Sequence, residues 1–293
     1  MTFTPSSVEL FEFKGRSFYV KRDDLTHPLL SGNKYRKLHF LLQTDSSKYT
    51  KIISYGGTQS NAMLAIATLA KLKNWDFLYY IKEDASTQVL STINSNYALA
   101  LSQGMEVETL DERAYTQLVE NGLRAEDKKI FFIPQGGATL QAQEGIAVLA
   151  DEIKAFQKAH NIQKLRVITP SGTGTTAYFL AKYLPQNSVL TTSGVGSNEY
   201  LKEQMSKLGT LPQNLEFLAS PKKYHFGKLH KDLLQIYQEL EIAGITFDLL
   251  YAPKLWISLM ASEDASIPSL YVHSGGVSGN KSMLERYLYK GWV

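Results

Sequence analysis

Apolar and polar residues along this chain follow two spacings, one typical of strands and one typical of helices, which alternate from segment to segment. Short runs that are apolar at each or at every second position predict strands, and runs with apolar residues three and four positions apart predict helices. Strands are expected at residues 7–13, 17–22, 51–55, 77–81, 106–110, 130–133, 166–169 and 247–250. Helices are expected at residues 34–43, 63–72, 92–102, 112–122 and 143–160. This alternation predicts an α/β fold with parallel sheets flanked by helices.

Three glycine-rich turns follow expected strands. They read Gly-Gly-Thr-Gln-Ser-Asn at residues 56–61, Ser-Gly-Thr-Gly-Thr-Thr at 171–176 and Ser-Gly-Gly-Val-Ser-Gly-Asn at 274–280. In parallel sheets, ligands gather at the carboxyl ends of the strands. We therefore expect these turns to contribute to one binding site, although they lie far apart in the sequence.

Composition excludes several classes of function. The chain of 293 residues is long enough for one large or two ordinary domains, and its net charge of +3 comes from dispersed basic residues, which argues against nucleic-acid binding. It has no cysteine, so disulfides, thiolate metal sites and cysteine nucleophiles are excluded, and no metal site is expected. No apolar run has the length of a membrane span, and the first residues lack a signal-peptide pattern, so a cytoplasmic protein is expected.

Lys34 stands at the mouth of an expected helix, after the chain-breaking Gly32. A cation in the first turn of a helix opposes the helix dipole, so this lysine needs another reason, such as covalent chemistry or an anionic ligand. A desolvated lysine with positive neighbours loses its proton more easily and can form a Schiff base. The alternative is an ordinary solvated lysine.

The turn at residues 171–176 follows one expected strand and opens a helix. Small residues there allow backbone N–H groups at a helix N-terminus to face a phosphate, and the hydroxyls of Thr173, Thr175 and Thr176 can add hydrogen bonds. The glycine spacing matches neither a Walker A motif nor a dinucleotide fingerprint. The alternative is a plain strand-to-helix turn.

A family resemblance is carried by two runs, Lys-Arg-Asp-Asp-Leu at residues 21–25 and Gly-Asn-Lys-Tyr-Arg-Lys-Leu at residues 32–38. Together they resemble the 1-aminocyclopropane-1-carboxylate deaminase and D-cysteine desulfhydrase family. These are pyridoxal 5'-phosphate (PLP) enzymes of fold type II, which is tryptophan synthase β-like. The resemblance implies a large PLP-binding domain from residues 1–36 and 145–293, and a small domain from residues 37–144. It also implies a small amino-acid substrate and a homodimer.

The resemblance also implies roles for individual residues. The catalytic residues would be Lys34, Ser60, Tyr251 and Tyr224. The cofactor-binding residues would be Lys34, Asn33, Asn61, Ser171, Gly172, Thr173, Gly174, Thr175, Thr176 and Ser274. Lys34 would carry the cofactor, Asn61 would face its phenolic oxygen, and Ser60 would carry a proton at the substrate. Helix capping is the alternative role for Ser60 and Asn61, and Tyr224 could equally be a packing tyrosine.

Ser274 would place a hydroxyl near the pyridine nitrogen of the cofactor. A hydroxyl does not force that nitrogen to stay protonated, so the ring is a weaker electron sink, which suits elimination.

The chain departs from the family pattern at Ala62, where a glutamine is common, and at Ala252, where the deaminases have a glutamate after the tyrosine. The second departure disfavours ring opening of aminocyclopropane carboxylate. The favoured activity is a D-cysteine-type α,β-elimination that gives a 2-oxo acid and ammonia. Three alternatives stay open: aminocyclopropane-carboxylate deamination, another PLP reaction such as serine or threonine dehydration or racemisation, and a catalytically weak PLP- or ligand-binding protein.

Overall fold

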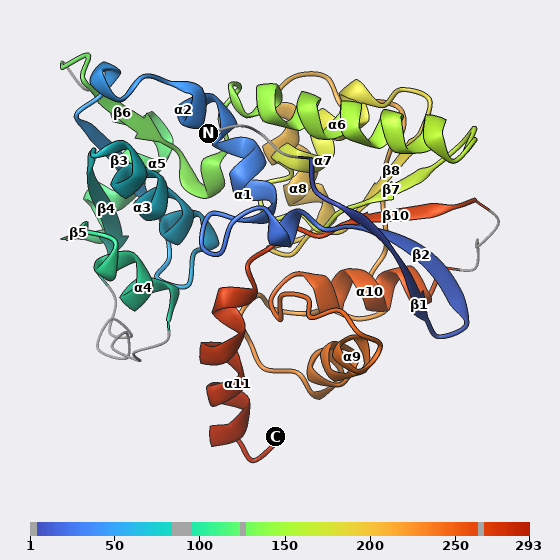
Figure 1. Cartoon of the computed structure of the whole chain (residues 1–293). Helices are drawn as coiled ribbons and strands as arrows, with labels where there is room; N and C mark the ends of the chain where they lie inside the picture. The colour runs from blue at the N-terminus through green and yellow to red at the C-terminus, as the bar shows by residue number, and fades with distance from the viewer. Residues whose placement is uncertain (1–4, 84–94, 124–126, 263–266) are drawn as a thin grey trace.

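The computed structural model describes residues 5–83, 95–123, 127–262 and 267–293, and its strands form two sheets (Figure 1). The larger sheet has the strand order β1 (Val8–Phe13), β2 (Arg16–Lys21), β10 (Ser269–Val272), β7 (Arg166–Ile168), β8 (Ser188–Thr191) and β9 (Leu215–Phe217). β1 pairs antiparallel with β2, and all the other neighbours are parallel.

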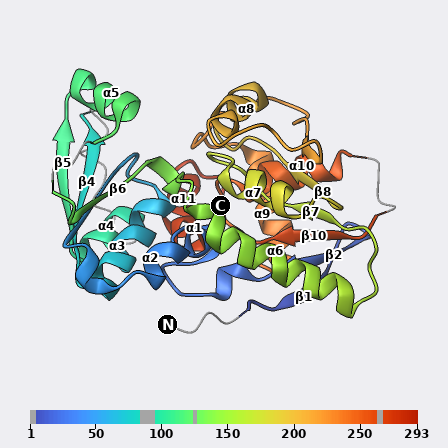
Figure 2. The same cartoon turned by 90° about the horizontal axis from the view of Figure 1, so that it is seen from above.

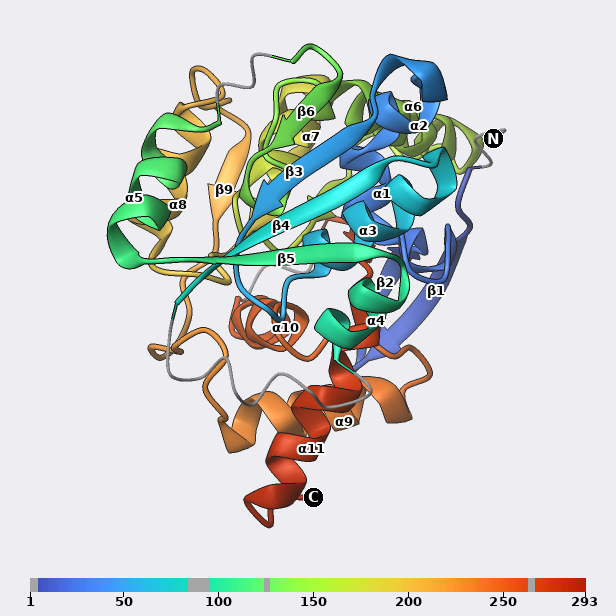
Figure 3. The ribbon, with the colours of Figure 1, turned by 90° about the vertical axis from the view of Figure 1, so that its left-hand side faces the viewer.

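The smaller sheet is parallel throughout. Its order is β5 (Met105–Leu110), β4 (Asp76–Lys82), β3 (Lys51–Tyr55) and β6 (Ile130–Ile133). Figure 3 shows this sheet in front of the larger one. The α/β fold class with parallel sheets flanked by helices is thus confirmed.

Helices cover the sheets and connect them. They are α1 (Gly32–Lys37), α2 (His39–Gln43), α3 (Asn61–Lys73), α4 (Asn96–Ser102), α5 (Glu112–Asn121), α6 (Ala142–Ala159), α7 (Thr175–Tyr183), α8 (Asn198–Ser206), α9 (Lys231–Ile242), α10 (Ala252–Met260) and α11 (Asn280–Tyr289). Figure 2 shows α2, α3 and α4 on the side of the smaller sheet that faces the larger one. In the part of the chain that the structure describes, no helix combines the length and the hydrophobicity needed to cross a bilayer.

The larger sheet is buried on both faces. In β7, Val167 packs into one apolar cluster with α6, α7 and α8, while its neighbour Ile168 packs into another with α9 and α10. β10 repeats the pattern, because Val272 belongs to the first cluster and Tyr271 to the second. Successive side chains of a strand point to opposite faces, so a strand covered on both sides is apolar at every position.

Two expected elements differ in the structure. The helix expected at residues 34–43 is divided into α1 and α2 at Leu38, whose backbone angles of φ −93° and ψ 7° leave the helical region. Residues 247–250 form no strand, because Asn280 bonds the backbone of Phe247 and Leu249, and Asp248 accepts from the backbone N–H of Tyr251. These side chains take the place of a neighbouring strand.

Other boundaries agree within a few residues. The helix expected at residues 92–102 is described from Asn96 onward, and residues 92–94 lie outside the described residues. All four strands of the smaller sheet fall within residues 37–144. The exact domain boundaries stay a prediction.

Candidate active site

The turn after β10 packs directly onto the start of α1. Gly32 has φ +61°, and a Cβ atom there would lie 2.0 Å from the backbone oxygen of Ser274. That oxygen accepts a hydrogen bond from the backbone N–H of Asn33 at 3.1 Å. A glycine is therefore required at position 32, and the contact fixes Ser274 next to the turn of helix that carries Lys34.

Lys34 is set up to lose its proton. Its Nζ donates to Asn33 Oδ1 at 2.7 Å. Burial lowers the pKa of Lys34 to about 8, and the negative charge of Asp248 opposes that shift only in part. A neutral amine is the form that attacks a carbonyl, so Lys34 is suited to hold a cofactor covalently.

Lys37 was not among the residues expected from the sequence. It is buried on the same helix, and its Nζ donates to the backbone oxygen of Gly136 at 3.0 Å and to Thr173 Oγ1 at 3.2 Å. Among the residues that the structure describes, no carboxylate lies within ion-pair distance of Lys37. Burial, reinforced by the charge of Lys34, holds the pKa of Lys37 well below its usual value. A buried cation of this kind calls for an anion.

The turn at residues 171–176 offers a place for that anion. α7 begins at Thr175, and Thr176 Oγ1 is buried without a hydrogen-bond partner in the described structure. Thr173 Oγ1 lies 3.0 Å from Thr175 Oγ1 and also meets Lys37. A helix N-terminus, threonine hydroxyls and an unpaired lysine together fit a phosphate group.

The two glycines of this turn have different physical roles. Gly174 has φ +78°, and a Cβ atom there would lie 2.5 Å from the side chain of Met205. Gly172 has no such strain, and its Cβ would lie 3.4 Å from the Tyr251 ring. Gly174 is thus required by the backbone and by the packing of α7 against α8, while Gly172 keeps the approach to Tyr251 open. Ser171 faces inward, where its Oγ accepts from Thr191 Oγ1 at 2.7 Å.

Ser60 and Asn61 begin α3. Ser60 is its N-cap and accepts from the backbone N–H groups of Ala62 and Met63, both at 3.2 Å. Ser60 therefore caps a helix, which was the alternative to its role as a proton carrier. Capping does not exclude that role. Asn61 Nδ2 lies beside the turn after β10, because a Cβ atom at Gly276 would be 2.3 Å from it.

Tyr251 lies against the turn at residues 171–176, since a Cβ atom at Gly172 would be 3.4 Å from its ring. A Cβ atom at Gly194 would be 2.4 Å from its ring, so glycine is needed there to admit it. Burial, with a smaller contribution from the Asp248 charge, raises the pKa of Tyr251, so that its hydroxyl stays protonated. Asp248, which the sequence did not single out, is itself buried, and burial raises its pKa to about 6 despite its backbone donors.

Tyr224 makes its contacts elsewhere. Its hydroxyl donates to Asp232 and its ring packs edge-on against His230, 5.2 Å between centroids. The nearby Phe226 does reach the site, with its ring centroid 5.2 Å from that of Tyr251. The structure thus brings Lys34, Asn61, Tyr251 and Ser274 to one place, whereas a catalytic role for Tyr224 stays a prediction that rests on the family resemblance.

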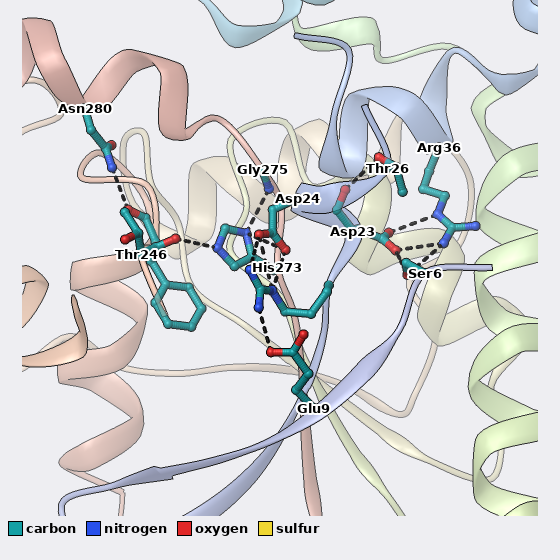
Figure 4. Close-up of polar contacts among 12 residues, drawn as sticks. Ser6, Glu9, Asp23, Asp24, Thr26, Arg36, Thr246, His273, Gly275 and Asn280 are labelled. Atoms are coloured by element: carbon teal, nitrogen blue, oxygen red, sulfur yellow. Dashed lines mark hydrogen bonds and ion pairs between the residues drawn. The ribbon is translucent and has the colours of Figure 1, made fainter. Parts of the chain in front are cut away.

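Part of the Lys-Arg-Asp-Asp run is structural. Asp23 accepts two hydrogen bonds from the Arg36 guanidinium, at 2.9 and 2.7 Å, and Asp24 lies 3.8 Å from His273 Nδ1 (Figure 4). His273 Nδ1 accepts from the backbone N–H of Gly275, so its Nε2 donates to the backbone oxygen of Thr246 at 3.0 Å. These contacts hold the turn that carries Ser274 in position.

Comparisons with known proteins identify the family of the chain. A family model described as pyridoxal-phosphate dependent enzyme matches residues 4–212. A Pyrococcus horikoshii protein provisionally named 1-aminocyclopropane-1-carboxylate deaminase is 26% identical, over 90% of this chain and 86% of that protein. A D-cysteine desulfhydrase of Yersinia enterocolitica is also 26% identical, over 91% of this chain and 88% of that enzyme.

Among solved structures, a homologue of 1-aminocyclopropane-1-carboxylate (ACC) deaminase superposes with a TM-score of 0.75 at 23% identity, covering 96% of this chain and 94% of that one. At this identity the match speaks for the fold. Since the family model covers well over half of the sequence and the site suits the cofactor, the chain belongs to the pyridoxal-phosphate-dependent enzyme family.

Proposed function

We propose that this enzyme is a lyase of small amino acids that catalyses the α,β-elimination of D-cysteine. The observation that carries the proposal is the pair of lysines on α1. Lys34 is half-buried and has a pKa of about 8, and Lys37 is buried and faces the turn at residues 171–176 without a carboxylate partner in the described structure. Two relatives that align with most of the chain support the substrate class. One is named D-cysteine desulfhydrase, and the other is provisionally named ACC deaminase.

In this proposal the residues of the turn at 171–176, with Lys37, would hold the phosphate of PLP, Asn61 would donate to its phenolic oxygen, and the Ser274 hydroxyl would face its ring nitrogen. Bound PLP supplies an electron sink for the charge that develops at the substrate Cα. Asn33 accepts from Lys34 Nζ and keeps that amine oriented.

Lys34 and Tyr251 divide the proton chemistry. Lys34, whose pKa burial lowers to about 8, is neutral in part near neutral pH, so it could take the proton from the substrate Cα. Tyr251 keeps its hydroxyl proton because its pKa is raised by burial, and it can donate to the departing sulfur. The net reaction converts D-cysteine and water to pyruvate, ammonia and hydrogen sulfide. Ser60, as a proton carrier, remains part of the proposal.

D-cysteine is preferred over the cyclopropane substrate because its thiolate leaves with the Cβ–S electron pair, whereas ring opening has no such leaving group. The position after Tyr251 supports this preference. Ala252 is buried in the apolar cluster with Trp256 and Phe247, so it brings no carboxylate to the site. An Ala252→Glu variant would bury a carboxylate in that cluster and would be destabilised.

The test is 2-oxo acid release from D-cysteine, L-cysteine, D- and L-serine, L-threonine and ACC, with Lys34→Ala as the blank. We expect pyruvate and sulfide from D-cysteine at a rate well above 2-oxobutyrate from ACC. Faster turnover of ACC would overturn the ranking, and faster dehydration of serine or threonine would assign another reaction. A protein that binds PLP but releases no 2-oxo acid from any of these substrates would be a racemase or a binding protein.

We further propose that the enzyme works in the cytoplasm as a homodimer, and that residues 1–36 with 145–293 and residues 37–144 form its two domains. The family resemblance supports the homodimer and the two domains, and the cytoplasmic location rests on the sequence pattern alone. Light scattering of the purified protein tests the dimer, and limited proteolysis tests the boundaries.

A further inference from the structure

Asn96 is the first residue of α4. It is completely buried, and both ends of its side-chain amide make hydrogen bonds. Its Nδ2 donates to Asn61 Oδ1 at 2.7 Å and to the backbone oxygen of Gln59 at 3.3 Å. Its Oδ1 accepts from Ser278 Oγ at 2.9 Å. One asparagine thus joins the turn after β3 to the residues that follow Gly275 and Gly276 after β10.

These contacts determine which way Asn96 faces. The backbone oxygen of Gln59 can only accept, so the Asn96 atom beside it must be the NH2 group. The same NH2 group meets Asn61, and the Asn61 atom that faces it must therefore be the carbonyl oxygen. An amide whose oxygen is fixed has its NH2 group fixed as well.

The free end of Asn61 points to the candidate cofactor site. Asn61 Nδ2 lies next to Gly276, where a Cβ atom would be 2.3 Å away, and it makes no hydrogen bond with the described residues. Gly279 leaves room on the other side, since its Cβ would lie 3.5 Å from Asn96 Nδ2 and 3.8 Å from Asn61 Oδ1. An unused amide donor held in this way is ready for an acceptor on a ligand.

We propose that Asn96 is a positioning residue that fixes the Asn61 amide so that its NH2 group, not its oxygen, faces the phenolic oxygen of the cofactor. This inference rests on the proposed cofactor site. Without Asn96 the Asn61 amide could turn over and set its oxygen against the phenolate. That contact would be repulsive and would exchange a donor for an acceptor. Asn96 also couples the two turns, because Ser278 bonds to it.

The main variant is Asn96→Asp, which keeps the shape but has only acceptors at neutral pH. Its carboxylate attracts the Asn61 NH2 group and so turns the amide over. We expect the PLP absorption band to shift and the dissociation constant of PLP to rise about tenfold, the scale of one hydrogen bond gained or left unmade. In an Asn61→Ala background the same substitution should leave both quantities unchanged.

Asn187→Asp is the matched control. Asn187 is also buried, and its Nδ2 donates to a side-chain amide oxygen, that of Gln157, at the same 2.7 Å. It lies near the start of β7, at the opposite end of that strand from the phosphate-binding turn, where its Oδ1 accepts from the backbone N–H of Leu165. We expect Asn187→Asp to lower the melting temperature without changing the absorption band. Asn96→Asp should change both.

Ser278→Ala covers the case in which Asn96→Asp does not fold. It removes one bond to Asn96 from a residue that is only partly buried, and it should shift the band in the same direction by a smaller amount. A wild-type band and a wild-type dissociation constant in folded Asn96→Asp or, failing that, in Ser278→Ala would overturn the proposal. So would a shift that persists without Asn61. If the unmodified protein binds no PLP at all, it is the proposed function that fails.

Discussion

α1 carries two kinds of cation within four residues, one kind paired with carboxylates and the other unpaired in the described structure. The Arg36 guanidinium is completely buried and is paired with two carboxylates, Asp23 and Glu152. On the same helix Lys37 is buried and Lys34 is half-buried, yet neither makes an ion pair within the described residues. Glu152 also binds Lys21 at 2.6 Å, so the paired region includes a second cation.

The contrast separates architecture from chemistry. Burial alone would lower the pKa of Arg36, but the adjoining carboxylates outweigh it and raise that pKa. For Lys37, burial and the charge of Lys34 act in the same direction and lower the pKa. A paired buried cation fixes the position of α1 against α6, whereas an unpaired one costs free energy that only a bound anion recovers. One short motif therefore contains a structural half, which is Arg36 with its carboxylates, and a reactive half, which is Lys34 and Lys37.

Lys34→Ala should have the largest effect on activity and almost none on the paired region. We expect turnover to fall by at least about three orders of magnitude, since the group that moves the proton is lost. The absorption band of lysine-bound PLP should disappear, while the circular dichroism spectrum stays that of the wild type. If the variant kept the band, Lys34 would not be the lysine that binds PLP, and the reactive half of the contrast would be wrong.

Glu152→Gln should break the structural half. It removes the negative charge that pairs with the buried Arg36 and Lys21. We expect the free energy of unfolding, measured with urea, to fall by about 3–5 kcal/mol. Asp151→Asn is the control, because its partner pair with Lys154 is exposed, and it should cost less than about 1 kcal/mol. Equal effects of the two variants would contradict the structural role of the buried network.

The same network predicts a pH dependence. Burial by itself would raise the pKa of Glu152, but Arg36 and Lys21 outweigh it and hold that pKa below its usual value. A carboxylate with a lowered pKa stabilises the fold fully above its ordinary pKa of about 4.3, and this contribution is lost as the pH falls through the lowered value. The difference in stability between wild type and Glu152→Gln should therefore be full above about pH 4.3 and should shrink as the pH falls through the lowered value.

Lys37→Met should weaken the binding of PLP without destabilising the cofactor-free protein. The dissociation constant of PLP should rise about 10- to 100-fold, because a charge-assisted contact to the phosphate is lost. The cofactor-free protein should be no less stable than wild type, since an unpaired buried charge is removed. Lys73→Met is the matched control: Lys73 also donates to neutral oxygens, those of Leu42 and Thr44, and PLP binding should not change. Unchanged PLP affinity in Lys37→Met would remove Lys37 from the site.

The smallest effect concerns pH and Lys34. The cofactor-free protein should recapture PLP faster as the pH rises through about 8, because the neutral amine is the reacting form. Its stability should also rise between that pH and the ordinary lysine pKa of about 10.4, since the unfolded chain binds more protons there. Stopped-flow absorbance checks the first expectation and urea unfolding the second. A rate that is flat across pH 8 would show that Lys34 is an ordinary lysine.

Residues with a local sequence signature could be predicted. Lys34 follows a glycine at a helix start, and the α/β alternation predicted the sheets that bring Asn61 and Ser274 near it. Lys37 has a weaker signal, because it lies three positions after Lys34 and so on the same side of a helix. That spacing could have found it.

Other residues depend on contacts that no local pattern carries. Asn96 is joined to Ser278 across 182 positions, and Lys37 meets Thr173 across 136. Asp248 stands in an apolar run that predicted a strand, and its carboxylate instead closes a turn onto the backbone of Tyr251. Side-chain bonds to the backbone competed with strand pairing there.

The most direct test of the contrast between paired and unpaired cations is borohydride reduction of the PLP-loaded protein, followed by peptide mapping with fragmentation. Lys34 and Lys37 lie three residues apart on α1, so the fragments must resolve the two. We predict that the reduced cofactor is attached to Lys34 and that Lys37 stays unmodified. Attachment to Lys37 or to any other lysine, or no attachment at all, would contradict the assignment.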